Sequence, residues 1–253
     1  MSPAILDRLD ARVFIFATTA ILLVLAAAIW IALWGFVSAN PASPAVDFNK
    51  YMEHTHRWLA TGQLYLPHQL AGPGVDDGDP LYPPLILYLT VPFVVLPAAL
   101  WWLLPLGLIA GIVVSFRPAP WTWPLIALAL AWPRTPALIY FGNPGMWIVA
   151  AVAAALRWRW PGPLILIKPS LAPFALIGIG SRGWLATLGL MVAAAIPFGA
   201  LWLDYVTVLR NAAVPITYSL SDLPFALLPV VAWLGRTSDA NGRPSGRDGR
   251  PSD

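Results

Sequence analysis

The sequence contains no cysteine, only one glutamate and very little charge for its length. Disulfide bonds and thiolate chemistry are therefore excluded. Only 11% of its 253 residues are charged, whereas soluble domains carry roughly 25%. Hydrophobic residues make up 58% of the chain, and the mean hydropathy is +0.70. Most of the chain thus has no polar face to offer to water, and the composition predicts an integral membrane protein.

The apolar runs predict helices that cross a bilayer, which takes roughly 20 residues per span. The run Phe14–Val37 is expected to be a retained first span. Shorter apolar stretches, several of them broken by proline, follow it: Pro84–Pro97, Ala98–Phe116, Trp121–Tyr140, Met146–Leu156, Pro161–Gly180, Leu185–Leu203 and Leu223–Leu234. The expected fold is an all-α, polytopic transmembrane helical bundle of about eight membrane segments, some of them short or re-entrant.

Arginines beside the apolar runs predict the orientation. Arg8 and Arg12 precede the first span and Arg236 follows the last, so both termini of this multi-pass cell-membrane protein are expected in the cytoplasm. The expected division is a cytoplasmic N-terminus (1–12), a first transmembrane helix (13–37), an external loop (38–83), a transmembrane bundle (84–235) and a disordered cytoplasmic tail (236–253). The arginines form no basic stripe, so nucleic acid is not expected as a partner.

One apolar stretch leaves the topology open. Arg157, Arg159 and Arg182 all favour the cytoplasm, yet they flank the single stretch that contains Lys168-Pro169. Either this stretch is a re-entrant hairpin, or one group of these arginines lies outside.

The 40–83 loop holds most of the groups that could carry acid–base chemistry. All three histidines are there, with Glu53 and four aspartates: His54, His56, His68, Asp47, Asp76, Asp77 and Asp79. Asp47 opens a predicted helix that runs to Ala60 and stops at Thr61-Gly62. On that amphipathic helix Phe48, Met52 and Leu59 are expected to share one side. Asp47 itself is either a catalytic carboxylate at the membrane surface or the N-cap of the helix.

Polar groups within the apolar region are costly and usually face a cavity or a partner. Arg134, Asn143 and Lys168 are such groups. A bound anion such as a phosphate would suit Lys168, and so would a structural ion pair with Asp204 or Asp222.

No cofactor or metal is expected from the residue spacing. His54 and His56 are two residues apart, so on a helix they face different directions and cannot readily share a metal. Asp76, Asp77 and Asp79 could offer oxygen ligands to a divalent cation, but the rest of an EF-hand loop is missing. A solvated turn is therefore favoured there.

Several short motifs, in order along the chain, resemble one enzyme family. They are Asp47-x-x-x-Tyr51, Trp58-Leu59-Ala-x-Gly62-x-x-Tyr65, Tyr82-Pro83-Pro84-Leu85, Gly142-Asn143 and Lys168-Pro169. Together they resemble the membrane mannosyltransferases of the GT-C superfamily, which use polyprenyl-phosphate-mannose. The resemblance covers roughly residues 40–200.

The resemblance implies an inverting sugar transfer on the outer face of the membrane. Asp47 would act as the base on the acceptor hydroxyl, while Lys168 and Arg134 would stabilise the departing lipid phosphate. The residues then expected to bind substrate are Tyr51, His54, Tyr65, Tyr82, Arg134, Asn143 and Lys168. The implied partners are membrane lipid and a polyprenyl-phosphate-linked sugar.

Two departures from the family pattern keep a second hypothesis open. Family members are considerably longer, and where they usually have Gly-Gln-x-Asn this chain has Gly142-Asn143-Pro144. The alternative is a non-catalytic membrane subunit or scaffold of the same fold, with a partner membrane protein that completes the bundle.

Overall fold

The computed structural model describes residues 3–39, 44–74, 76, 78–212 and 221–237, and its regular elements there are helices. The α-helices are α1 Pro3–Ala39, α2 Val46–Thr61, α3 Pro67–Ala71, α4 Ile86–Thr90, α5 Leu100–Ser115, α6 Trp123–Ala131, α7 Arg134–Phe141, α8 Gly145–Trp158, α9 Arg182–Ala195, α10 Leu201–Ala212 and α12 Leu223–Leu234. The expected all-α fold is confirmed. Of the tail predicted to be disordered (236–253), Arg236 and Thr237 are described and contact Pro118 and Arg117, and positions 238–253 lie outside the described residues.

Helix lengths support membrane crossing only in part. By length and composition, α1 could span a bilayer through its apolar segment Asp10–Gly35. Two helix pairs would qualify if each counts as one bent span: Pro120–Ala131 with α7, bent by 60°, and Arg182–Phe198 with α10, bent by 94°. Helices α5, α8 and α12 are apolar but shorter. The described chain therefore has one to three helices that pass this test.

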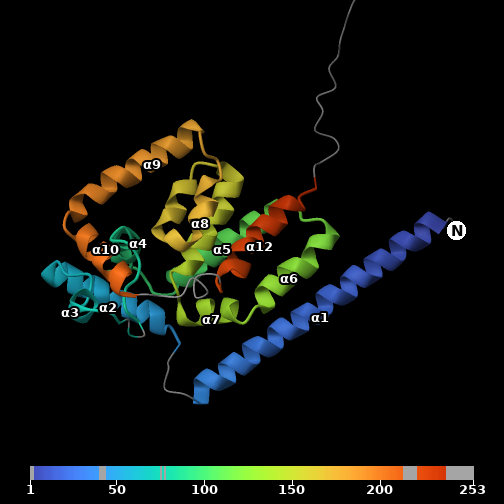
Figure 1. Cartoon of the computed structure of the whole chain (residues 1–253). Coiled ribbons are helices and arrows are strands. Elements are labelled where there is room, and N and C mark those ends of the chain that lie inside the picture. Colours follow the sequence, from blue (N-terminus) through green and yellow to red (C-terminus); the bar gives the residue numbers. More distant parts are fainter. Residues whose placement is uncertain (1–2, 40–43, 75, 77, 213–220, 238–253) are drawn as a thin grey trace, which may run out of the picture.

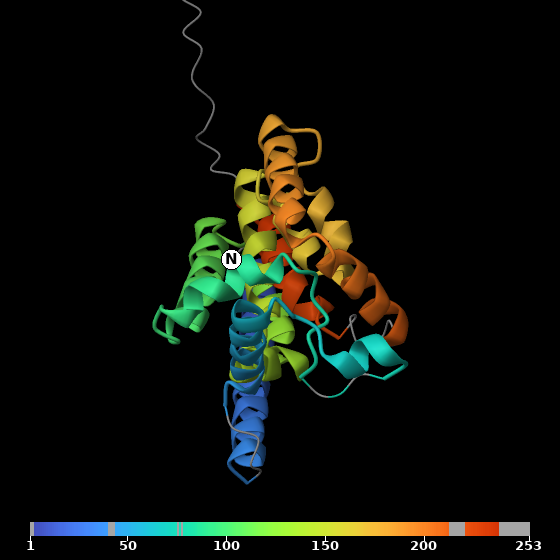
Figure 2. The ribbon, with the colours of Figure 1, turned by 90° about the vertical axis from the view of Figure 1, so that its left-hand side faces the viewer.

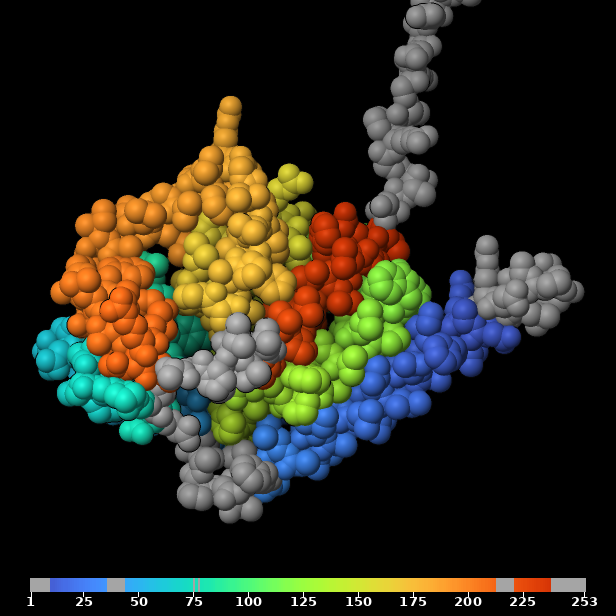
Figure 3. Space-filling model, viewed as in Figure 1, coloured from blue at the N-terminus to red at the C-terminus, as the bar shows by residue number. Residues whose placement is uncertain are grey.

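Helix α1 lies on the outside of the molecule. It runs along α6 and reaches α7, as Figures 1 and 3 show. Only 6% of its apolar segment is buried against the rest of the chain. Near its C-terminal end, the Trp34 ring meets Tyr140 edge-on at 5.9 Å between centroids. Such an apolar, mostly uncovered helix is suited to contact with lipid.

Helices α5, α8 and α12 form the centre of the core, and they run in the same direction. Trp101, near the start of α5, donates its Nε1–H to the Gly142 carbonyl (2.7 Å) just before α8 and packs against Trp147. The middle of α8 is rich in alanine; Ala153 and Ala155 are fully buried. Small side chains let neighbouring helices approach closely, as is usual inside membranes.

The opposite end of this core carries the arginines that flank the apolar runs, and we call it the arginine end. Arg117 after α5 and Arg236 after α12 meet there: Pro118 pairs with Arg236, and the Thr237 hydroxyl donates to the Arg117 carbonyl at 3.0 Å. Arg157, close to the last residue of α8, lies at the same end.

The stretch around Lys168 turns back on itself. It forms two 3-10 helices, Gly162–Ile167 and Pro169–Leu176, which pack against each other. Gly162, at the start of the first 3-10 helix, lies close to Ala175, near the end of the second. A Cβ on Gly162 would be only 2.9 Å from the Ala175 carbonyl oxygen. The stretch is therefore a hairpin. Its tip is Lys168, and its two ends, with Arg159 and Arg182, lie together at the arginine end.

Helix α2 matches its predicted bounds closely, because Gly62 ends it. Gly62 adopts φ 75°, a left-handed conformation that glycine accepts without strain, and its N–H donates to the Trp58 carbonyl at 2.7 Å. Phe48 is buried against Trp101. Leu59 is 51% exposed, so the expected common apolar side does not bury all of its members.

Helix α3 packs against the end of α10, as Figure 2 also shows. The Asn211 side chain donates to the Gln69 carbonyl at 2.8 Å, and the Gly74 N–H donates to the Asn211 carbonyl at 3.2 Å. These contacts tie residues far apart in the sequence, so α2, α3 and α10 gather at the end of the core opposite the arginine end.

Candidate active site

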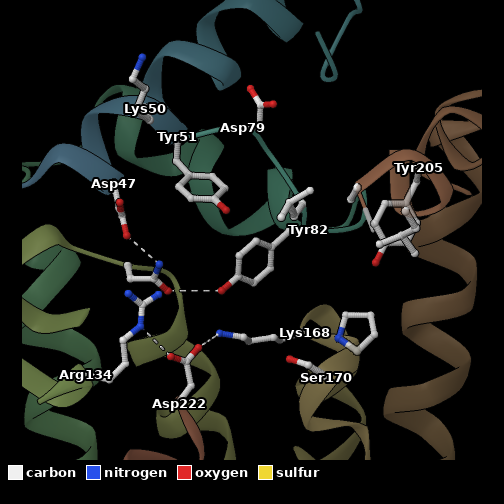
Figure 4. A pocket seen from close by; sticks show the side chains of 16 residues that line it. Asp47, Lys50, Tyr51, Asp79, Tyr82, Arg134, Lys168, Ser170, Tyr205 and Asp222 are labelled. Carbon is white, nitrogen blue, oxygen red and sulfur yellow. Dashed lines mark hydrogen bonds and ion pairs between the residues drawn. The ribbon is translucent and has the colours of Figure 1, made fainter. Parts of the chain in front are cut away.

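A cavity of about 320 Å³ opens at the end of the core opposite the arginine end. Segments between Asp47 and Asp222 that lie far apart in the sequence line it, and Figure 4 shows their side chains. Its lining residues are Asp47, Lys50, Tyr51, Gly78, Asp79, Leu81, Tyr82, Arg134, Asn143, Lys168, Pro169, Ser170, Tyr205, Leu209, Ala212 and Asp222. Charged groups therefore share this space with the apolar side chains of α10.

Two cations and one carboxylate form the polar base of the cavity. Arg134 Nε lies 3.1 Å from Asp222 Oδ1, and Lys168 Nζ binds Asp222 Oδ2. The Asp222 side chain is only 5% exposed and that of Lys168 14%. Two cations thus share the Asp222 carboxylate at the base of the cavity, and Asp47 is the second carboxylate in the lining.

The second carboxylate, Asp47, has a neutral partner. It accepts a hydrogen bond from Asn143 Nδ2 at 2.7 Å (Figure 4). Asp47 lies in the first turn of α2, where the N-cap position is held by Ala45 with φ 67° and no side-chain hydrogen bond. The alternative interpretation of Asp47 as the N-cap is therefore wrong.

Asn143 is held in place by its own neighbours. Its Oδ1 accepts from the Gly145 N–H at 2.8 Å, and the Tyr82 hydroxyl approaches the same oxygen at 3.5 Å. Gly142, just before it, adopts φ 71°, and a Cβ there would stand 2.6 Å from the Trp102 ring and 2.9 Å from Phe48. Only glycine fits this turn, which aims Asn143 at Asp47.

The environments of the two carboxylates differ in a way that suits different roles. Burial raises the pKa of Asp47, although the hydrogen bond from Asn143 and the nearby cations Arg134 and Lys168 oppose this rise. A carboxylate of raised pKa is a better proton acceptor than one that is fixed in ion pairs. Asp222 is occupied by two cations, so Asp47 is the candidate base of this site.

Most of the residues expected to bind substrate do line this cavity. Tyr51 and Tyr82 meet edge to face above the charged group, with 5.6 Å between ring centroids. Lys168 Nζ lies 5.8 Å from the centre of the Tyr82 ring. Arg134 and Asn143 complete the set.

The structure does not bring His54 to the cavity lining. His54 is 3% exposed; its Nε2 bonds to the Gly78 carbonyl and its Nδ1 to Arg57, both at 2.8 Å. Burial lowers the pKa of the imidazole, which favours a neutral ring that donates to Gly78 and accepts from Arg57. His54 therefore ties α2 to the loop that carries Gly78 and Asp79.

Tyr65 is also placed elsewhere. It is 3% exposed, donates to the Tyr82 carbonyl at 2.9 Å and stacks on Tyr205 at 6.2 Å between ring centroids. Both of these contacts are residues of the cavity lining. Tyr65 thus supports the wall of the cavity from behind.

Sequence reasoning missed the central place of Asp222. It considered Asp222 and Asp204 only as structural partners of Lys168, and the structure pairs Lys168 with Asp222. The signal was present, because these two are the acids that lie between the 40–83 loop and the tail. Nothing in the local pattern, however, ranked one above the other. Lys50, Asp79, Ser170 and Tyr205 were likewise not expected in the lining.

Comparisons with protein-family models, with curated proteins and with solved structures found no match for this chain.

Proposed function

We propose that this chain is a glycosyltransferase that moves a sugar, mannose by the family resemblance, from a polyprenyl-phosphate-sugar to an acceptor hydroxyl on the outer face of the membrane. The observation that supports this most is the content of one cavity. It combines a carboxylate of raised pKa whose hydrogen-bond partner is Asn143, two cations that share the Asp222 carboxylate, and apolar side chains. The carboxylate can accept a proton, the two cations can bind an anion, and the apolar side chains can contact a lipid chain.

The proposed reaction uses these groups in one displacement. Asp47 takes the proton of the acceptor hydroxyl as its oxygen forms the new bond to the sugar carbon C1. The bond between C1 and the phosphate oxygen breaks, and the electron pair leaves with the lipid phosphate. Lys168 and Arg134 stabilise the negative charge that develops on that oxygen. Attack from the face opposite the leaving phosphate inverts the configuration at C1.

The depth of the cavity fits a lipid-linked donor. Helix α8 has 14 residues between the cavity and the arginine end, a length of about 21 Å at roughly 1.5 Å per residue. The hydrocarbon core is about 30 Å thick. With the arginine end at the cytoplasmic surface, the cavity lies in the outer part of the bilayer, within reach of a lipid phosphate at the outer headgroups.

We infer the full topology from the same geometry. Six segments of the described chain each run between the two ends of the molecule: α1, α5, the bent pair of α6 and α7, α8, the bent pair of α9 and α10, and α12. The stretches 84–97 and 161–180 instead return to the end where they began. This gives an even number of crossings, with both termini and the flanking arginines in the cytoplasm. It also accommodates about eight membrane segments, two of them re-entrant.

Cysteine labelling tests this topology directly, because the chain has no native cysteine. An impermeant thiol reagent should label Ala71→Cys, an exposed position of α3, in intact cells. The same reagent should label Thr237→Cys, exposed beside Arg117 at the arginine end, only after the cells are opened. The opposite pattern would reverse the orientation, and equal labelling of both in intact cells would mean an odd number of crossings.

One observation favours the alternative of a non-catalytic subunit. Both cations are already paired with Asp222, as they would be in a purely structural ion network. Purification in mild detergent distinguishes the two functions. The enzyme should carry a bound polyprenyl phosphate, detectable by mass spectrometry, and should transfer radiolabelled mannose from its lipid phosphate to an acceptor in membranes. A stoichiometric protein partner, without bound lipid and without transfer, would support the subunit instead.

A further inference from the structure

A second cluster of functional groups lies on the wall of the same end of the molecule. His68 of α3 faces two aspartates of the following loop, and its Nε2 lies 2.8 Å from Asp79 Oδ2 and 3.6 Å from Asp76 Oδ2. One ligand atom from each residue lies within 4.8 Å of the other two. Imidazole and carboxylate together form a ligand set that suits zinc and related first-row divalent ions.

We propose that His68, Asp76 and Asp79 bind a divalent cation of the zinc class. Bond lengths of about 2.0–2.1 Å to a tetrahedral ion place neighbouring ligand atoms about 3.3 Å apart. The two distances from His68 fall on either side of that value, and the three ligand atoms lie within 4.8 Å of one another. Asp76, whose side chain is 84% exposed, has room to move toward the ion. The metal takes the place of the Nε2 proton of a neutral imidazole, and that proton moves to Nδ1. Remaining coordination positions are left to water or to an anionic ligand.

The burial of Asp79 supports a cation at this place. Its side chain is 4% exposed, and among the described residues its ion-pair partner is His68, which also lies in this cluster. Its Oδ2 also accepts a hydrogen bond from the Asp76 N–H at 2.8 Å. A buried carboxylate is costly unless a positive charge compensates it. A divalent cation held by His68, Asp76 and Asp79 would supply that charge.

The surroundings hold these ligands in position. Gln69, next to His68 and 1% exposed, accepts from the Leu66 N–H at 2.9 Å and donates to the Pro80 carbonyl at 3.3 Å. It therefore fixes α3 against the chain that directly follows Asp79. Outer hydrogen bonds of this kind, which orient the elements that carry the ligands, are typical of metal sites.

The proposed site has a consequence for the cavity. Asp79 belongs to the cavity lining, and Gly78 beside it is bonded to His54 of α2. A metal bound here would join α3 to this loop and stiffen one wall of the cavity. This holds whatever reaction the cavity supports, so the inference does not depend on the proposed transfer.

Metal binding by the purified, EDTA-treated chain in detergent tests the inference. Calorimetry should give one equivalent of Zn²⁺, and Co²⁺ should give a visible absorption band from its bound form. At a hundredfold excess of Zn²⁺ over its Kd, the melting temperature should rise by about 5 °C. His68→Gln should lose the calorimetric signal, the Co²⁺ band and the shift, while its melting temperature without metal stays near that of the wild type.

A matched control separates this site from adventitious binding. His56→Gln changes an exposed histidine of α2 and should leave Zn²⁺ binding unchanged. Absence of Zn²⁺ binding in the wild type, or equal binding in His68→Gln, would overturn the proposal. Equal affinity for Mg²⁺, Ca²⁺ and Zn²⁺ would also count against it, because that pattern would indicate exposed carboxylates without the imidazole.

Discussion

Replacing Asp47 with asparagine is expected to lower the initial rate of sugar transfer by about 10³-fold, because general-base catalysis contributes roughly 10²–10⁴-fold. Asparagine has nearly the same shape, and its oxygen can still accept the hydrogen bond from Asn143. The melting temperature and the binding of polyprenyl phosphate should therefore change little. The measurement is a radiolabelled transfer assay in membranes with equal amounts of each protein.

The pH dependence gives a second measure of the same role. Transfer requires ionised Asp47, and burial raises the pKa of this carboxyl above its ordinary value. The wild-type rate should fall as the pH falls through that raised pKa, at a higher pH than an ordinary aspartate would give. The residual rate of Asp47→Asn should lack this acid limb.

The control for Asp47 is Asp204→Asn, since Asp204 lines a different, smaller pocket beside Tyr65. It should keep the wild-type transfer rate and pH profile. If Asp47→Asn keeps more than about a tenth of the wild-type rate, the loss is smaller than removal of a general base produces. The assignment of Asp47 as the base would then be wrong.

Replacing Lys168 with methionine is expected to weaken polyprenyl-phosphate binding and to lower transfer by about 10²-fold, as the loss of one stabilising group usually does. Methionine keeps the apolar stem and removes the charge. Asp222 keeps its ion pair with Arg134 at 3.1 Å, so this carboxylate is not left without a partner. The chain should therefore fold, with a lowered melting temperature. Lipid binding and thermal stability are measured on the same detergent samples.

A double variant separates the anion site from a structural ion pair. In Lys168→Met with Asp222→Asn, Arg134 also loses the carboxylate that lies 3.1 Å from its Nε, so this double variant should be less stable than Lys168→Met alone. Lipid-phosphate binding should stay weak, because the ammonium group is still missing. If the single variant binds lipid phosphate as well as the wild type but melts much earlier, Lys168 is structural and the anion site is wrong.

The sequence could predict the elements whose signals are local. Gly62 ends α2 near its predicted limit, and the run Leu223–Leu234 coincides with α12. The bends and the hairpin were harder to predict. Trp132-Pro133 lies between α6 and α7, inside a run that was expected to be one segment. Whether the stretch around Lys168 crosses the membrane or forms a hairpin depends on which segments its two ends pack against. The hydropathy of the sequence does not indicate these contacts.

The site was predictable where a polar residue interrupts an apolar run. Lys168 and Asn143 stood out for this reason, and both line the cavity. His54 was misplaced because its surroundings are set by Gly78, 24 residues further along the chain. The sequence also did not indicate that Asp222 belongs to the site, because its partners Arg134 and Lys168 lie far from it along the chain. A long-range partner can be recognised as available in the sequence, but only the fold shows which partner is used.

The three residues of the ion group at the base of the cavity are synthesised at different times. Lys168 precedes Asp222 by 54 residues and Arg134 precedes it by 88. At roughly 5–20 residues per second, Lys168 leaves the ribosome ~3–11 s before its carboxylate. An unpaired charge in the hydrocarbon costs about 2.5–3.5 kcal/mol on insertion scales. Lys168 is thus synthesised before the carboxylate that pairs with it, and the ion pair can form only after Asp222, at the start of α12, has been made.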